Sequence, residues 1–80
     1  MIMIDVLVPP LDRAFDFEVD EKICPMNLIE DVERLIESRE KVHFSLEKRE
    51  LFLYRLGEFV KAELPLNIQG VVNGDRLILI

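Results

Sequence analysis

The amino-acid sequence predicts an α+β domain in which one helix packs across a mixed sheet of about five strands. Three patterns support this fold class. Apolar and polar residues alternate near the N-terminus, a helical period follows over Pro25 to Glu40, and short strand-like runs occupy the rest. Two strands, one helix and further strands are typical of a helix lying on one sheet face. A chain of 80 residues can build one hydrophobic core, so residues 1–80 are expected to form a single domain.

The N-terminal residues are predicted to form a β-hairpin. Residues 2–8 are mostly β-branched and apolar, and Pro9–Arg13 form the turn because proline cannot donate a ladder hydrogen bond. Beyond the turn, three apolar residues alternate with three acidic ones, namely Phe15, Phe17 and Val19 with Asp16, Glu18 and Asp20. This alternation predicts one buried and one solvent-facing side for the second strand.

The segment from Pro25 to Glu40 is predicted to be an amphipathic helix. Its apolar residues fall on one stripe, consisting of Leu28, Ile29, Val32, Leu35 and Ile36. Two starts are open: Asn27 with Glu30 resembles a capping box, and Pro25 suits a first helical position. We expect Ile29, Val32 and Ile36 to pack against Phe17 and Leu77.

The C-terminal half is predicted to supply the remaining strands. Val42, Phe44 and Leu46 show a period of two, but a connection is favoured over a strand for Lys41 to Glu50. Strands are expected at Leu51–Arg55, Glu58–Val60 and Arg76–Ile80, with an irregular connection from Leu64 to Val71 and a tight turn at Asn73-Gly74-Asp75. The first and last strands are apolar on both sides, which predicts central positions in the sheet.

Composition excludes several classes of function. The net charge of −6 and pI of about 4.7 disfavour binding to nucleic acid, and the basic pair Lys48-Arg49 is flanked by Glu47 and Glu50. No apolar run is long enough to span a membrane, so no membrane insertion is expected, and the N-terminus lacks the basic region of a signal peptide. With Cys24 as the single cysteine, a reducing, cytoplasmic location is predicted.

The C-terminal stretch Gly70-Val71-Val72-Asn73-Gly74-Asp75-Arg76-Leu77 resembles a motif of ubiquitin-like proteins. Their last strand is commonly preceded by Gly-hydrophobic-x-Asn/Asp-Gly-Asp/Ser-x-Leu, and Leu66 lies where that pattern has a buried leucine. The short chain, the Pro25 helix start and the end in a strand most resemble the EsaB/YukD family, small ubiquitin-like accessory proteins of type VII secretion systems in Gram-positive bacteria. The resemblance spans nearly the whole chain.

This resemblance implies a ubiquitin-like β-grasp fold and a non-catalytic role. The implied function is a cytoplasmic protein that supports assembly or regulation of a secretion machine through contacts with its protein components. The alternative is a general ubiquitin-like adaptor, or a homodimerising domain, from another pathway.

No catalytic, cofactor-binding or metal-binding residues are predicted. Cys24 lies near a helix start, but nothing in the sequence brings His43 beside it. The helix acids Glu30, Asp31, Glu33 and Glu37 are interpreted as a solvated surface. Ubiquitin and the sulfur carriers of the same fold react through a C-terminal Gly-Gly, whereas Leu77–Ile80 continue the last strand, so conjugation is not expected.

The candidate site is the sheet face opposite the helix. If Ile4, Val6, Phe17, Leu53, Leu77 and Leu79 face the helix, alternation places six apolar residues on the other face, namely Met3, Leu7, Phe52, Tyr54, Ile78 and Ile80. Such a patch marks a protein-binding surface unless loops cover part of it or the residues are merely scattered. A protein partner is therefore predicted, with homodimerisation as one form of it.

Overall fold

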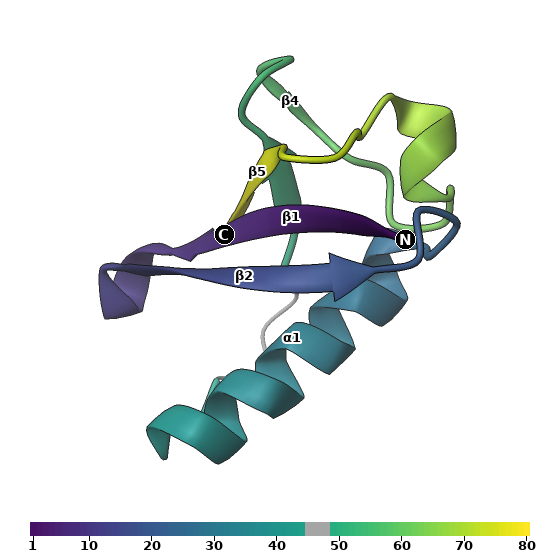
Figure 1. The fold of residues 1–80 in the computed structure, drawn as a ribbon. Helices are drawn as coiled ribbons and strands as arrows, with labels where there is room; N and C mark the ends of the chain where they lie inside the picture. The colour runs from purple at the N-terminus through teal and green to yellow at the C-terminus, as the bar shows by residue number, and fades with distance from the viewer. Residues whose placement is uncertain (45–48) are drawn as a thin grey trace.

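The computed structural model describes residues 1–44 and 49–80, which form a sheet with one helix across it (Figure 1). The strands are β1 (Ile2–Val8), β2 (Arg13–Val19), β3 (Leu51–Leu53), β4 (Glu58–Phe59) and β5 (Arg76–Leu79). The helix α1 spans Pro25–Glu40, and two short 3-10 helices span Pro9–Leu11 and Leu66–Gln69. The predicted α+β fold class is confirmed.

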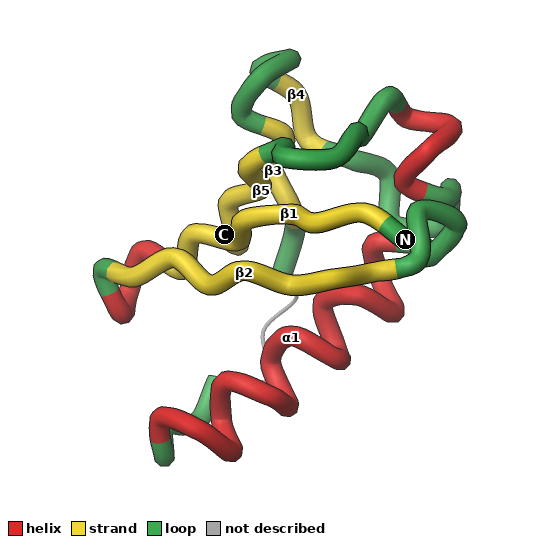
Figure 2. Tube along the Cα trace, in the orientation of Figure 1, coloured by secondary structure: helices red, strands yellow, loops and turns green. Residues whose placement is uncertain are grey.

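The sheet is mixed, with the strand order β2-β1-β5-β3-β4 (Figure 2). β1 and β5 run parallel, and the other three neighbouring pairs are antiparallel. The first and last strands therefore lie inside the sheet, as their apolar character predicted. β2 and β4 form its two edges.

Alternation along the strands separates a buried face from an exposed one. Every second residue of β1 is buried, beginning at Ile4, and Leu51, Leu53, Leu77 and Leu79 continue the same layer across β3 and β5. Phe17 on the edge strand β2 is only half-buried, although it packs against this core. The predicted core-facing set is thus confirmed, with its edge member less covered.

The helix begins at Pro25, with Cys24 as its N-cap, so the proline start is the correct one of the two predicted. It ends at Glu40, and Lys41 is its C-cap, with a left-handed backbone (φ 56°) and an N–H that donates to the carbonyl of Glu37 at 3.1 Å. Its buried residues are Pro25, Leu28, Val32 and Ile36, and Ile29 is half-buried. The placement of Leu35 on the buried stripe was wrong. Leu35 is 41% exposed because it lies beside β2, where the sheet ends.

Several predicted boundaries shift by one or two residues. β2 begins earlier than the alternation indicated, and β3 ends at Leu53 because the chain turns at once, with Gly57 donating its N–H to the Leu53 carbonyl at 2.9 Å. β4 and β5 end one residue early, at Phe59 and Leu79. In the connection from Lys41 to Glu50, the described residues 41–44 and 49–50 form no strand; Leu46 lies outside the described residues.

The stretch before β5 packs inward as the motif predicted. Leu66 is fully buried, and Gln69 ties this stretch to the chain after β4 by hydrogen bonds to Lys61 and Leu64. Gly70 adopts a left-handed conformation (φ 86°) at the end of the second 3-10 helix. This connection therefore packs against the hydrophobic core near the N-terminal end of α1.

Candidate functional site

The solvent face of the sheet carries a continuous apolar row. Strand register places Leu7 opposite Ile78, Ile78 opposite Phe52, and Phe52 opposite Phe59. On the far side, Leu7 lies opposite Ala14 of β2. These five residues, hereafter the apolar row, cross all five strands on the face turned away from α1. Cross-strand neighbours of this kind lie close enough for their side chains to touch.

The two aromatic residues of the row contact each other directly. The rings of Phe52 and Phe59 meet edge to face, with centroids 5.1 Å apart and planes at 75°. Phe59 is 50% exposed and lies on the edge strand β4. Sequence reasoning missed Phe59, because a two-residue strand has no readable alternation of its own. The available signal was its aromatic character two residues after the turn at Leu56-Gly57.

The next row of the same face is charged. Asp5 lies opposite Arg76, and its carboxylate accepts a hydrogen bond from Arg76 Nε at 2.6 Å. The two residues form an ion pair, with Arg76 Nη2 2.5 Å from the same carboxylate oxygen. Tyr54 joins this row, since its N–H donates to the Arg76 carbonyl at 3.1 Å, and its side chain is 67% exposed. An apolar surface on this face is therefore bounded on one side by an ion pair.

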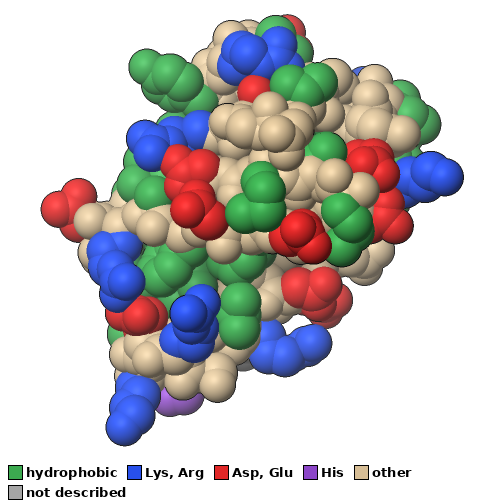
Figure 3. Space-filling model, viewed as in Figure 1, with side chains coloured by type: hydrophobic (Ala, Val, Ile, Leu, Met, Phe, Trp, Pro, Cys, Tyr) green, Lys and Arg blue, Asp and Glu red, His purple; other side chains and the backbone are tan. Residues whose placement is uncertain are grey.

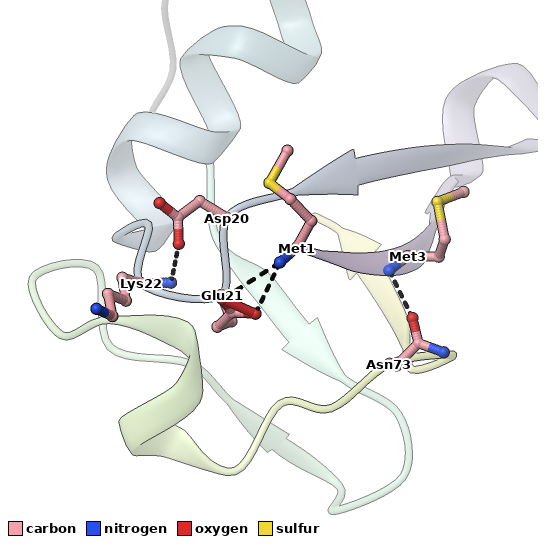
Figure 4. Close-up of polar contacts among 6 residues, drawn as sticks. All are labelled: Met1, Met3, Asp20, Glu21, Lys22 and Asn73. Atoms are coloured by element: carbon pink, nitrogen blue, oxygen red, sulfur yellow. Dashed lines mark hydrogen bonds and ion pairs between the residues drawn. The ribbon is translucent and has the colours of Figure 1, made fainter.

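The structure brings together only part of the predicted six-residue surface. Leu7, Phe52 and Ile78 belong to the apolar row. Ile80 follows β5 and exchanges two backbone hydrogen bonds of 2.9 Å with Glu50, and alternation from Ile78 puts it on the same face. Tyr54 lies in the charged row instead. Met3 lies beyond that row, where its N–H donates to the side-chain oxygen of Asn73 at 2.7 Å (Figure 4).

The Asn73-Gly74-Asp75 turn holds β1 in place through hydrogen bonds. Besides the Asn73 contact, the Gly74 N–H donates to the Met3 carbonyl at 2.7 Å, and the Asp5 N–H donates to the Asp75 carbonyl at 2.9 Å. Gly74 has a φ of 89°, which favours glycine over any residue with a side chain. The motif that carried the ubiquitin-like resemblance thus fixes β1 against β5.

Asp75 is the one fully buried charged residue among those described, at 5% exposure. Its carboxylate accepts two hydrogen bonds from Arg55 and one from the Val72 N–H at 2.8 Å. These contacts, the Arg55 bonds first, hold the pKa of Asp75 below its usual value despite burial. Arg55 also donates to the Gly70 carbonyl at 2.6 Å, so this pair joins the turn after β3 to the turn before β5.

Cys24 and His43 lie at opposite ends of α1. Cys24 is the N-cap and His43 follows the C-cap, so they are separated by a 16-residue helix, which is about 24 Å long at 1.5 Å per residue. The Cys24 thiol instead donates to the Glu63 carbonyl at 3.6 Å. The geometry supports no Cys/His pair.

Two of the four helix acids are not the solvated groups that the sequence predicted. Glu33 is half-buried and pairs with Arg49 at 3.4 Å, and burial raises its pKa. Glu37 accepts a hydrogen bond from the Phe44 N–H at 2.8 Å and so anchors the chain after α1. Glu30 and Asp31 are exposed. The spacing of acidic residues along a helix does not show which of them will pair with residues that follow the helix.

The described residues contain neither a metal-binding cluster nor a membrane-spanning helix. Within residues 1–44 and 49–80, no three His, Cys, Asp or Glu side chains are grouped closely enough to hold a metal ion. In the same residues, no helix combines the length and apolar character needed to cross a lipid bilayer.

Comparison with solved structures defines the fold. The chain is similar to the ubiquitin-like domain of an Arabidopsis thaliana protein, with a TM-score of 0.73 and 19% identity over 99% of this chain and 74% of that one. It is also similar to the EccD5 ubiquitin-like domain from Mycobacterium xenopi, with a TM-score of 0.77 and 22% identity over 99% of this chain and 91% of that one.

A chain of the MycP5-free ESX-5 inner membrane complex gives a TM-score of 0.81 and 17% identity over 99% of this chain, which spans only 20% of that longer chain. No protein-family model matches the sequence, and no curated protein matches it. At these identities the likeness establishes the fold, which is that of a ubiquitin-like β-grasp domain.

Proposed function

We propose that this chain is a non-catalytic ubiquitin-like interaction module that binds a protein partner through the solvent face of its sheet. The observation that carries the proposal is the apolar row, which crosses all five strands and includes the half-exposed Phe59. A soluble domain seldom exposes such a continuous row without a partner. The ion pair between Asp5 and Arg76 at the edge of this row suits the polar rim of an interface.

The proposed context is a bacterial type VII secretion system, in which the chain acts in the cytoplasm as an accessory or regulatory component. Two observations support it. The sequence resembles the EsaB/YukD family, and the fold is similar to that of the ubiquitin-like domain of EccD5, a type VII secretion component. The alternative is a general ubiquitin-like adaptor or homodimerising domain from another pathway, because one fold serves many functions.

The test compares three tagged forms of the protein by affinity capture from native cells, followed by mass spectrometry. The wild type is expected to retain a secretion-system component. The Phe52→Ala, Ile78→Ala double variant should retain less than about a tenth of it, because truncating central interface anchors often costs 2 kcal/mol or more. Glu30→Ala is the matched control, since Glu30 is exposed on α1.

The possible results separate the two parts of the proposal. Equal capture by the folded double variant would show that the sheet face is not the binding site. If the partner whose capture is lost belongs to an unrelated pathway, or is a second copy of the chain, the result would favour the alternative. The folding of every variant is checked first by circular dichroism.

A further inference from the structure

The outer edge of β2 presents backbone groups that no described residue binds. The Asp5 N–H points toward β5, because it donates to the Asp75 carbonyl. The even-numbered residues of β1 therefore face β2, where they lie opposite Arg13, Phe15, Phe17 and Val19. On β2 the N–H and C=O groups of Ala14, Asp16 and Glu18 consequently point outward, and none of them bonds to residues 1–44 or 49–80. This edge is open to an added strand.

A groove lies beside this edge on the helix side of the sheet. It has a volume of about 250 Å³ and runs between β2 and α1. Its apolar lining includes Phe17, Val19, Val32 and the exposed Leu35. Hydrophobic side chains gather between β2 and α1 in the space-filling view (Figure 3).

The two ends of this region differ. At the start of β2, Arg13 forms an ion pair with Glu40 at the end of α1 and lies over the Phe15 ring, 4.8 Å from its centroid. Toward the end of β2, the lining of the groove contains Glu18, Asp20 and Asp31 but no Lys or Arg. Met1 also lines this end, and its N-terminal ammonium pairs with Glu21 at 3.1 Å. Acidic groups therefore outnumber basic ones where the groove reaches the end of β2.

The charges also select the kind of occupant. A second copy added antiparallel in the register that pairs the full length of β2 would place Asp16 opposite Asp16, and like charges directly opposite are destabilising. A strand with Lys or Arg at alternate positions would instead face Asp16 and Glu18 on the solvent side. Its intervening apolar side chains would lie over the groove, because successive residues of a strand point to opposite faces.

We propose that the outer edge of β2 binds an extended segment of a partner protein, in which basic and apolar residues alternate, as a sixth strand of the sheet. Backbone hydrogen bonds to Ala14, Asp16 and Glu18 supply the pairing. Apolar side chains of the segment fill the groove between β2 and α1. Apart from Ala14, whose side chain ends the apolar row, the residues of this surface are distinct from that row.

The test uses two synthetic seven-residue peptides, one alternating Lys and Val and the other alternating Glu and Val, titrated into the full 80-residue protein. The Lys peptide should bind at least tenfold more tightly than the Glu peptide. Hydrogen exchange should show new protection of the amides of Ala14, Asp16 and Glu18. Asp16→Pro removes one outward N–H and should weaken binding at least tenfold, since an edge strand tolerates proline where its N–H faces solvent.

A charge-reversed variant serves if the proline variant does not fold. The double variant Asp16→Lys, Glu18→Lys keeps the backbone groups and reverses the charge. Its preference between the two peptides should therefore invert, and the Glu peptide should bind at least tenfold more tightly than the Lys peptide. Equal binding of both peptides to the wild type would overturn the proposal. Protection confined to Phe52 and Ile78 would also overturn it, and would assign the peptide to the sheet face. Concentration-dependent protection of the β2 amides without peptide would indicate a second copy as the occupant instead.

Discussion

Two nitrogens of Arg55 donate hydrogen bonds to the buried carboxylate of Asp75, Nε to Oδ1 at 2.8 Å and Nη2 to Oδ2 at 3.0 Å. The two residues are 20 positions apart in the sequence. Arg55 follows β3 and Asp75 precedes β5. Because these strands are antiparallel, the pair lies at the end of the sheet where β3 ends and β5 begins. Stability and its dependence on pH should both respond to this contact.

We predict that Asp75 contributes stability that is lost in acid. Because Arg55 holds the pKa of Asp75 below its unfolded value of about 3.9, the contribution is complete above roughly pH 5 and is lost as pH falls through the lower folded value. Asp75→Asn should therefore be less stable than the wild type at pH 7, by about 1–3 kcal/mol. Its stability should fall less steeply between about pH 5 and pH 2.

Urea unfolding at several pH values measures both effects. Glu30→Gln is the control, because Glu30 is exposed on α1, and it should follow the wild-type curve. Parallel curves for Asp75→Asn and the wild type through the acid range would rule out a stabilising ionised Asp75.

Val32→Asp should unfold the domain. Val32 is 2% exposed beneath the sheet, and an unpaired carboxylate there would cost several kcal/mol of a total stability of about 5–15 kcal/mol. Leu35→Asp, three residues along the same helix, should stay folded because Leu35 is 41% exposed. Thermal unfolding followed by circular dichroism distinguishes them, and equal melting temperatures for the two variants would contradict the assigned helix face.

Gly74→Ala should destabilise the domain by about 1–2 kcal/mol, because alanine disfavours the left-handed backbone conformation of Gly74. Gly74 has a φ of 89°, yet an added Cβ would meet no atom within 4 Å. A chemically synthesised chain with D-alanine at position 74 is the matched control, since a D-residue favours positive φ and should be at least as stable as the wild type. Equal destabilisation by both residues would point to a steric clash.

The Phe52 and Phe59 rings should be energetically coupled. An edge-to-face pair contributes about 0.5–1.5 kcal/mol beyond its buried area, so the effects of Phe52→Leu and Phe59→Leu on unfolding free energy should not add. A double-mutant cycle in urea measures the coupling. Strict additivity within about 0.3 kcal/mol would show that the two aromatic members of the apolar row act independently.

Local patterns were enough to predict the helix and the succession of helix and strands along the chain. The apolar stripe predicted α1 and left two starts open, of which Pro25 is the observed one, and β-branched runs on both parities identified β1 and β5 as interior strands. The closing Asn73-Gly74-Asp75 turn was also readable, because positive φ at Gly74 is a property of the residue itself. These features depend on neighbours in the sequence.

The composition of the site depended on contacts between distant residues. The sequence placed six apolar residues on one face, but only strand register shows that Leu7, Ile78 and Phe52 adjoin, that Phe59 joins them, and that Arg76 separates them from Met3. Likewise Leu35 and Glu33 carry the same local signals as their helix neighbours. Their exposure was decided by where the sheet ends at β2 and by where Arg49 returns to the helix. Periodicity fixes the direction of a side chain relative to its own element, whereas its neighbours are set by the packing of the whole chain.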